Sequence, residues 1–312
     1  MAALLNSRIV ASTLTVLTAG GLGTYAATRY FGIQNAFAES PASRITSQPT
    51  KVFGRVPAFK YLRLHSEESV NHNTKRLRFE LPGGEGAVSG LGLTSALLTF
   101  SKPEVSWTPV VRPYTPVSKL DEPGFIELLV KKYPNGKAST HLHSLKPGDS
   151  LFILGVIPGF SWAPNKFNHV YLIAGGAGIT PIYQLAQGIL DNPADKTKVT
   201  VICGVNAEED LLFREELDAY KKQFPGRFDV HYAVSRPSET FKPDADNGLR
   251  SGYVDSKVLG EVMQGPGEQG TKVFVCGPPA METSLVGGGP FGKTGKGILE
   301  QLGYSKDKIH RF

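Results

Sequence analysis

The sequence predicts an antiparallel β-barrel followed by a doubly wound α/β domain, with an apolar segment in front of both. Between about residues 52 and 164, short strand-like runs alternate with turn residues, and no long helical period appears. From about residue 165 onward, strand-like runs alternate with helical ones, which is typical of a parallel sheet. We therefore expect a targeting or anchor segment with its linker (1–51), a barrel domain (52–164) and an α/β domain (165–312).

The composition is that of a loop-rich globular enzyme. The 312 residues are 40% apolar and include 35 glycines and 22 prolines, which is enough chain for two cores. Cys203 and Cys276 lie in separate apolar runs without metal-ligand spacing, so we expect neither a disulfide framework nor a metal site. The net charge of +6 favours acidic partners, and because no nucleic-acid motif accompanies it, we expect an acidic protein as partner and no nucleic acid.

The first 38 residues contain no acidic residue and two arginines, Arg8 and Arg29. The 20 uncharged positions between them would span about 30 Å as a helix, just enough for a bilayer, although three glycines weaken such a helix. A mitochondrial presequence and a single N-terminal membrane anchor are both consistent with this pattern, and a marginal anchor behind a presequence satisfies both. A disordered tail is the third alternative. Residues 39–51, rich in Ser, Thr and Pro, are interpreted as a linker.

Periodicity places the individual elements of the two domains. In the barrel domain we expect strands at Tyr61–Leu64, Lys75–Leu81, Leu97–Phe100, Phe125–Val130 and Ser150–Leu154. In the α/β domain we expect strands at Val170–Ala174, Val199–Cys203, Phe228–Val234 and Lys272–Cys276. Helices are expected at Ile182–Leu190, Asp210–Phe224, Ser256–Met263 and Gly295–Leu302.

A glycine turn follows the first strand of the α/β domain. Val170–Ala174 is an apolar run typical of a strand buried on both faces, and three glycines then precede Pro181 and a helical apolar pattern. A strand, a glycine turn and a helix N-terminus together form a general anion site, since the missing Cβ atoms let a flat or phosphorylated ligand approach free N–H groups. The turn does not fit the G-x-G-x-x-G dinucleotide fingerprint, so an ordinary βα turn remains an alternative.

Two stretches of the barrel domain carry further candidate ligand groups. Arg112-Pro-Tyr-Thr offers a fixed donor fork for a diphosphate, an aromatic ring with a hydroxyl, and a short hydroxyl. The stretch from Lys131 to Ser139 adds cations, an aromatic residue and a Gly-x-x-Ser turn whose N–H groups are able to hold phosphate. Each stretch taken alone is equally consistent with an exposed turn.

The last strand of the α/β domain ends in Cys276-Gly-Pro-Pro. A thiol at a strand tip above a rigid turn can pack against a flat ring, although on its own a core cysteine is the simpler interpretation. The carboxyl ends of parallel strands share one edge of a sheet, so this turn and the glycine turn should face the same crevice.

Taken together, these motifs resemble those of the ferredoxin-reductase-like flavoprotein superfamily and, within it, the NADH–cytochrome b5 reductase family in its fungal mitochondrial form. The resemblance covers residues 55–312, and its specificity lies in the combination of Arg-x-Tyr-Thr, Gly-Gly-x-Gly-Ile-Thr-Pro and Cys-Gly-Pro-Pro-x-Met, together with the C-terminal Phe312. It implies an FAD-binding barrel and an NADH-binding α/β domain. It also implies an enzyme that takes a hydride from NADH and passes single electrons to cytochrome b5 or a similar acidic haem protein.

The resemblance also implies roles for individual residues. Thr115, Thr180 and Cys276 are the expected catalytic positions, in the sense that they position the flavin and the nicotinamide. Arg112 and Tyr114 would contact the FAD diphosphate and ribityl part, and Thr115 would hydrogen-bond near flavin N5. The full set of expected cofactor-binding residues is Arg112, Pro113, Tyr114, Thr115, Lys131, Tyr133, Gly136, Lys137, Ala138, Ser139, Gly175, Gly176, Ala177, Gly178, Thr180, Pro181, Ser235, Arg236, Cys276, Gly277, Pro278 and Met281.

The chain departs from the family pattern at three places. Ala177 stands where a threonine is common, and Gly155-Val156 replaces a common Gly-Pro pair. Ser235 stands where the family usually has an aspartate, a carboxylate that accepts from a ribose 2′-OH and repels a 2′-phosphate. The resemblance implies NADH as the donor, but Arg236 after Ser235 offers a partner for a 2′-phosphate, so NADPH is kept as an alternative.

Other functions remain open from the sequence. A reductase of the same fold for a quinone or a ferredoxin-like acceptor is one alternative, and a redox-inactive, membrane-tethered binding module is another. Basic side chains that are candidates to steer an acidic cytochrome are Lys131, Lys132, Lys137, Lys166 and Lys293, although for any one of them a solvated surface is the simpler interpretation. We expect a monomer, located at the mitochondrial outer membrane or in the intermembrane space.

Overall fold

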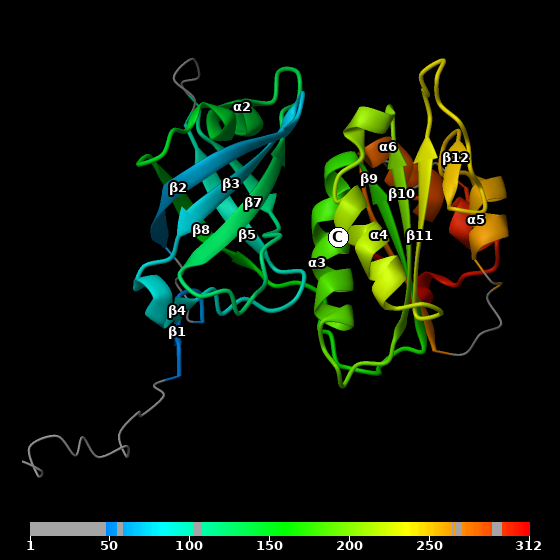
Figure 1. The fold of residues 1–312 in the computed structure, drawn as a ribbon, viewed down its shortest axis with the longest axis horizontal. Coiled ribbons are helices and arrows are strands. Elements are labelled where there is room, and N and C mark those ends of the chain that lie inside the picture. The colour runs from blue at the N-terminus through cyan, green and yellow to red at the C-terminus, as the bar shows by residue number, and fades with distance from the viewer. Residues whose placement is uncertain (1–47, 55–58, 103–107, 264, 266–269, 289–294) are drawn as a thin grey trace, which may run out of the picture. The chain divides into compact units, whose positions relative to one another are not determined.

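The computed structural model describes residues 48–312 except 55–58, 103–107, 264, 266–269 and 289–294 (Figure 1). The proposed presequence or anchor therefore lies outside the described residues. Within the described part of the chain, no helix is both long enough and apolar enough to cross a bilayer.

The first half of the described chain is a six-stranded antiparallel sheet with the order β6-β5-β8-β2-β3-β7 (Figure 1). Its strands are β2 (Lys60–Asn71), β3 (Thr74–Glu80), β5 (Ala96–Ser101), β6 (Val110–Tyr114), β7 (Phe125–Lys131) and β8 (Ser150–Ile157). Alternate residues point into one core, where Leu62, Leu77 and Phe79 are fully buried. Among the described residues, the edge strands β6 and β7 share no hydrogen-bonded ladder that would close the expected barrel. The short strands β1 (Thr50–Lys51) and β4 (Ala87–Val88) pair separately.

The second half is a six-stranded parallel sheet with the order β12-β11-β10-β9-β13-β14. Its strands are β9 (His169–Gly175), β10 (Lys198–Val205), β11 (Phe228–Val234), β12 (Leu249–Ser251), β13 (Thr271–Cys276) and β14 (Ile309–Arg311). The helices are α3 (Ile179–Leu190), α4 (Arg214–Gln223), α5 (Ser256–Val262), α6 (Pro279–Val286) and α7 (Ile298–Gln301). The expected antiparallel-then-parallel architecture is thus confirmed.

Strand β9 is central to this sheet and is buried on both faces. Val170, Leu172 and Ala174 face a core formed with α3 and α4, whereas Tyr171 and Ile173 face a second core formed with α5, α6 and α7. Helices on both faces explain why the strand is continuously apolar rather than alternating.

Several elements differ from the sequence-based expectation. Arg112 lies in strand β6 rather than in a loop, and Pro113 is tolerated there because β6 is an edge strand. Two helices were not expected, α2 (Lys137–Ser144) and α6, which begins at the second proline of the Cys-Gly-Pro-Pro stretch. Helix α4 begins at Arg214 rather than at Asp210, because Glu208–Asp210 form a 3₁₀ turn, and the last expected helix shrinks to α7.

The two halves pack through side chains of both. Val117 and Leu129 from the first half belong to the same apolar cluster as α3 and β9. The buried side chain of Gln184 on α3 donates from Nε2 to the carbonyl of Pro116 at 2.6 Å and accepts a hydrogen bond from the backbone N–H of Thr94. The buried N–H of Thr94 and the carbonyl of Pro116 in the first half therefore find their hydrogen-bond partner in the second half.

Candidate active site

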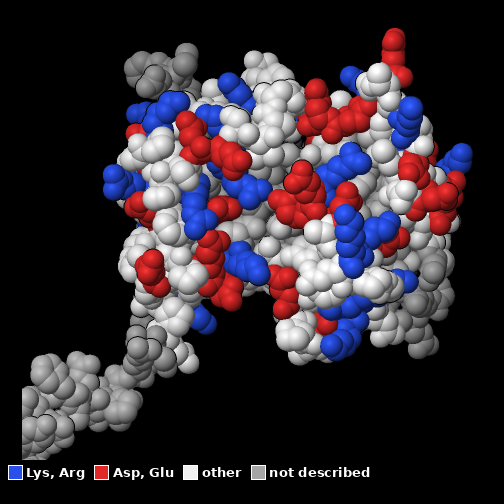
Figure 2. All heavy atoms as spheres, in the orientation of Figure 1, with Lys and Arg blue, Asp and Glu red and all other residues white. Residues whose placement is uncertain are grey.

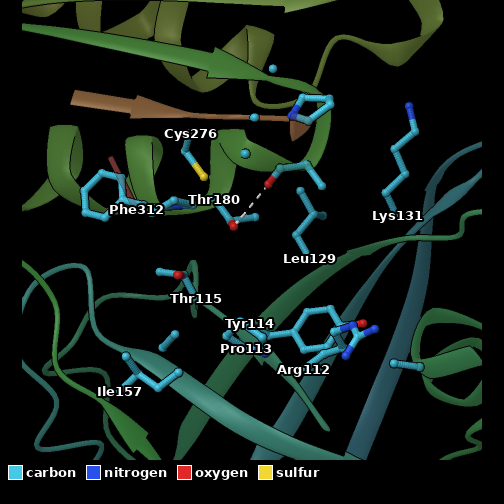
Figure 3. A pocket seen from close by; sticks show the side chains of 18 of the residues that line it. Arg112, Pro113, Tyr114, Thr115, Leu129, Lys131, Ile157, Thr180, Cys276 and Phe312 are labelled. Atoms are coloured by element: carbon cyan, nitrogen blue, oxygen red, sulfur yellow. Dashed lines mark hydrogen bonds between the residues drawn. The ribbon is translucent and has the colours of Figure 1, made fainter. Parts of the chain in front are cut away.

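A cavity of about 1090 Å³ lies between the antiparallel sheet and the carboxyl ends of β9 and β13. One wall is built by β6, the residues just after it, the end of β8 and the start of α2. The opposite wall is built by the turns that follow β9 and β13 and by the C-terminal residues. Figure 3 shows Thr115 on the first wall facing Thr180 and Cys276 on the second.

Arg112 and Tyr114 lie together on the barrel wall (Figure 3). Arg112 is exposed, lines the cavity, and donates from Nη1 to the carbonyl of Val111 at 2.8 Å, which holds one side of the guanidinium. Burial raises the pKa of Tyr114 to about 12, although the charge of Arg112 acts in the opposite direction. Tyr114 is therefore a neutral phenol at physiological pH, able to donate a hydrogen bond beside a fixed cation.

The turn that precedes α2 is shaped by Ser139. Its Oγ accepts from the N–H of Tyr133 at 3.2 Å and donates to the carbonyl of Gly136 at 3.0 Å. A Cβ at Gly136 would lie 2.5 Å from that Oγ, so the tight turn requires glycine there. No side chain caps α2, and its first-turn N–H groups are left for an anion from the crevice. The Ser139 hydroxyl thus builds the turn, and phosphate recognition here would rest on backbone N–H groups.

The turn after β9 packs closely on the turn after β13. A Cβ at Gly178 would lie 2.2 Å from the carbonyl oxygen of Cys276, and a Cβ at Gly175 would lie 2.4 Å from the sulfur of Met281. Packing of one turn on the other thus requires glycine at both positions, a reason that the expectation of ligand approach did not include. Gly176 has a φ of +51° and open space around it, so its requirement is conformational.

Thr180 and Cys276 present small groups to the crevice. Thr180 Oγ1 donates to the carbonyl of Ala177 at 3.3 Å, the bond drawn in Figure 3. Burial raises the pKa of Cys276 to about 12, and the nearby charge of Glu282 adds to the shift. Cys276 is consequently a neutral thiol, suited to packing against a ring rather than to nucleophilic chemistry.

Two basic residues of the crevice already have partners. Lys131 Nζ lies 2.6 Å from Oδ1 of Asp210, a carboxylate of the parallel-sheet half, so its charge is paired between the halves. Lys137 Nζ lies 3.5 Å from the hydroxyl of Thr108. Burial raises the pKa of Tyr133, and the backbone of Ala177 hydrogen-bonds to its hydroxyl, so this aromatic side chain spans the crevice.

Most of the residues expected from the sequence line this one cavity. They are Arg112, Pro113, Tyr114, Thr115, Lys131, Tyr133, Gly136, Lys137, Ala138, Ser139, Gly175, Ala177, Gly178, Thr180, Pro181, Cys276, Gly277 and Pro278. Four do not line it: Gly176 faces a neighbouring hollow, Met281 packs behind Gly175 and Gly277, and Ser235 and Arg236 follow β11.

Sequence reasoning missed a further part of the lining. These residues are Thr94, Ala96, Val110, Leu129, Asn135, Ile157, Pro158, Gly159, Phe160, Pro279, His310 and Arg311. His310 and Arg311 reach the crevice because β14 pairs with β13. Phe312, which follows β14, stacks on Phe274 with ring centroids 5.8 Å apart. Among these residues, only Pro158-Gly159-Phe160, just after β8, have a sequence that is typical of a turn.

The donor set fits a flavin dinucleotide together with a nicotinamide nucleotide. A fixed guanidinium and uncapped helix N–H groups suit a diphosphate, and the space between Thr115 and Cys276 is lined by small or flat groups that suit stacked rings. An antiparallel domain and a doubly wound domain sharing such a crevice define the class of two-domain flavin- and nicotinamide-dependent oxidoreductases.

Comparison with known proteins agrees with this class. Residues 61–162 match the oxidoreductase FAD-binding domain, and residues 172–286 match the oxidoreductase NAD-binding domain. "NADH-cytochrome b5 reductase 2" of Pyricularia oryzae is 42% identical over 310 residues, covering 98% of this chain and 90% of the relative. The protein of the same name from Emericella nidulans is 44% identical over 281 residues, covering 89% of this chain and 84% of the relative.

Among solved structures, the cytochrome b5 reductase domain of Ulva prolifera nitrate reductase superposes with a TM-score of 0.71 at 28% identity. That match covers 85% of this chain and all of that domain. The chain belongs to the NADH–cytochrome b5 reductase family, and it is an oxidoreductase with an FAD-binding and an NAD-binding domain.

Proposed function

We propose that this protein oxidises NADH with bound FAD and delivers single electrons to cytochrome b5 or a similar haem protein. The proposal is supported by the names of its relatives and, above all, by one observation. The crevice sets Thr115, Arg112 and Tyr114 opposite Thr180 and Cys276, which come from the other domain. A flavin held by the first group would meet a nicotinamide held by the second.

The residues of the crevice act by binding and orientation. When bound there, the isoalloxazine supplies two-electron acceptance from the nicotinamide and one-electron release to a haem. Arg112 and the N–H groups at the start of α2 would hold the diphosphate, and Thr115 would direct a hydroxyl at the ring. Tyr114 and Cys276 each have a pKa raised to about 12, so neither is a general base near neutral pH.

Recognition of the acceptor would draw on basic side chains near the crevice. Lys132, Lys137 and Lys166 are exposed, Lys131 is paired with Asp210, and Lys293 lies outside the described residues. On the face shown in Figure 2, basic and acidic side chains are intermingled. We expect the rate of cytochrome reduction to fall as ionic strength rises.

An anaerobic titration of the purified protein tests this function. The visible flavin absorption should bleach on addition of NADH, and ferric cytochrome b5 added afterwards should be reduced at a rate matching turnover. Bleaching without reduction of the cytochrome would favour another acceptor, such as a quinone or a ferredoxin-like protein. A protein that stays colourless after incubation with FAD would instead favour the redox-inactive binding module.

The N-terminal segment would direct the protein to mitochondria and anchor it at the outer membrane or in the intermembrane space, as its acid-free, Arg-containing composition suggests. Protease protection and alkaline extraction of isolated mitochondria check this placement, with a freely soluble cytosolic protein as the contradicting result. Sedimentation velocity checks the expected monomer.

A further inference from the structure

A second group of polar residues lies at the carboxyl ends of β10 and β11, outside the crevice. The two strands stay paired beyond their ends, because Ser235 N–H donates to the carbonyl of Val205 at 3.0 Å and Arg236 N–H donates to that of Asn206 at 2.8 Å. The Ser235 hydroxyl also donates to Asn206 Oδ1 at 3.2 Å. The loops after the two strands therefore leave the sheet side by side.

Glu208 is fastened across these two loops. Its Oε1 accepts from the Ser238 hydroxyl at 2.7 Å, and its two carboxylate oxygens lie 3.2 and 3.3 Å from the Ser238 N–H. The Ser238 hydroxyl bond is the main reason that the pKa of Glu208 lies below its usual value. A partly exposed, oriented carboxylate is thus held against Ser238, on the loop that also carries Ser235 and Arg236.

The position of these loops relative to the crevice suggests a ligand. A nucleotide bound to a parallel sheet lies along the carboxyl ends of its strands, and β10 and β11 are the next two strands after β9 in the sheet order. A small hollow lined by Gly176, Val205 and Asp210 connects the turn after β9 with the end of β10. A dinucleotide with its nicotinamide at Cys276 would extend along this edge and present its adenosine ribose to the loops of β10 and β11.

We propose that Glu208, oriented by Ser238, is the carboxylate that selects an adenosine ribose with a free 2′-OH and so sets the preference for NADH over NADPH. This inference rests on the proposed function. A carboxylate accepts a hydrogen bond from a 2′-OH and repels a 2′-phosphate. Arg236 is exposed, and no carboxylate in the described ranges forms an ion pair with it, so it is the cation that a 2′-phosphate would use once the repulsion was removed.

The test removes one charge and keeps the shape. In Glu208→Gln, kcat/KM for NADPH should rise about tenfold and that for NADH should fall severalfold, since a unit charge within a few ångströms of a surface phosphate is worth about that much. The Kd of 2′,5′-ADP, measured by calorimetry, should fall in the same variant while that of ADP rises. Adding Arg236→Gln should abolish the gain for both NADPH and 2′,5′-ADP.

Glu209→Gln is the matched control. Glu209 is the neighbouring exposed carboxylate, but its side chain lies near His72 rather than Ser238, so both nucleotides should be used as by the wild type. An unchanged NADPH/NADH ratio in Glu208→Gln, or an equal change in Glu209→Gln, would overturn the inference. These outcomes differ from failure of the reductase function itself, in which neither nucleotide would bleach the flavin of the wild type.

Discussion

Replacing Asp210 with alanine should destabilise the contact between the two halves of the protein. Asp210 comes from the 3₁₀ turn after β10, and its Oδ1 accepts from Lys131 Nζ of β7 at 2.6 Å and from Asn73 Nδ2 at 3.2 Å. The two charged side chains are 10% and 16% exposed, so water screens them little. Removal of the carboxylate leaves the Lys131 ammonium largely buried and without its counter-charge.

The expected loss is about 3 kcal/mol in the free energy of unfolding. Breaking a buried ion pair by removing one partner typically costs this much, since most of the cost is the desolvation of the charge that remains. A double-mutant cycle with Asp210→Ala and Lys131→Ala should therefore show a coupling energy of about 2 kcal/mol.

The assay is urea unfolding of the FAD-loaded protein, followed by far-UV circular dichroism. A second ion pair between the halves, Lys119 with Asp191 at 2.9 Å, serves as the control because its side chains are 62% and 33% exposed. Its cycle should give about 0.5 kcal/mol or less. Equal coupling energies in the two cycles, or a loss below about 0.5 kcal/mol in Asp210→Ala, would refute the assignment of a buried interdomain pair.

The Asp210 pair also has a defined pH dependence. Burial alone would raise the pKa of Asp210, but hydrogen bonds from Lys131 and Asn73 outweigh it and hold the pKa below its usual value. A depressed folded-state pKa gives stability that is complete above the ordinary aspartate pKa of about 4 and is lost as the pH falls through the folded value. The stability difference between the wild type and Asp210→Ala should thus be constant from neutral pH down to about 5 and shrink in stronger acid.

Three further experiments test the residues of the site and the contacts that hold them in place. Gly178→Ala should lower the free energy of unfolding by about 3 kcal/mol because its Cβ would meet backbone atoms at 2.2 Å. Gly176→Ala has open space but a φ of +51°, and it should lower the free energy of unfolding by about 1 kcal/mol. Equal losses for the two variants in thermal unfolding would contradict the packing assigned to Gly178. Gln184→Leu should cost about 3 kcal/mol by leaving two buried backbone groups unpaired, and a neutral result would show that water replaces the amide. Native Cys276 should resist iodoacetamide at about pH 8, since burial raises its pKa to about 12, and rapid labelling detected by mass spectrometry would disprove this assignment.

The four central strands of the parallel sheet could be predicted closely because each is rich in apolar residues, whereas the short edge strands β12 and β14 were not expected. Phe228–Val234 has the expected bounds, and β9 extends the expected run by only one residue at each end, since helices cover both faces of the sheet. The positions of two turns after parallel strands predicted that both face one crevice, and the family resemblance implied that the two barrel stretches, 112–118 and 131–139, line the same site.

Other features depend on contacts that no local pattern reveals. Helix α2 buries only Ala138, Ser139 and Leu142 of its eight residues, so its apolar period is too weak to detect. Lys131 was expected to line the cofactor, but its pairing with Asp210 joins residues 79 positions apart. Similarly, the hydrogen bond from the Ser238 hydroxyl to Glu208 joins residues 30 positions apart, so the sequence around Ser235 did not reveal this carboxylate.

The proposed function depends on a crevice that holds FAD on the barrel wall and receives a nicotinamide on the opposite wall. The most direct measurement is the visible spectrum of the purified full-length protein before and after anaerobic addition of NADH, followed by ferric cytochrome b5. Flavin bands should bleach with NADH and reappear as the haem is reduced. A protein without flavin bands after incubation with FAD, or one whose bands persist in excess NADH, would contradict it.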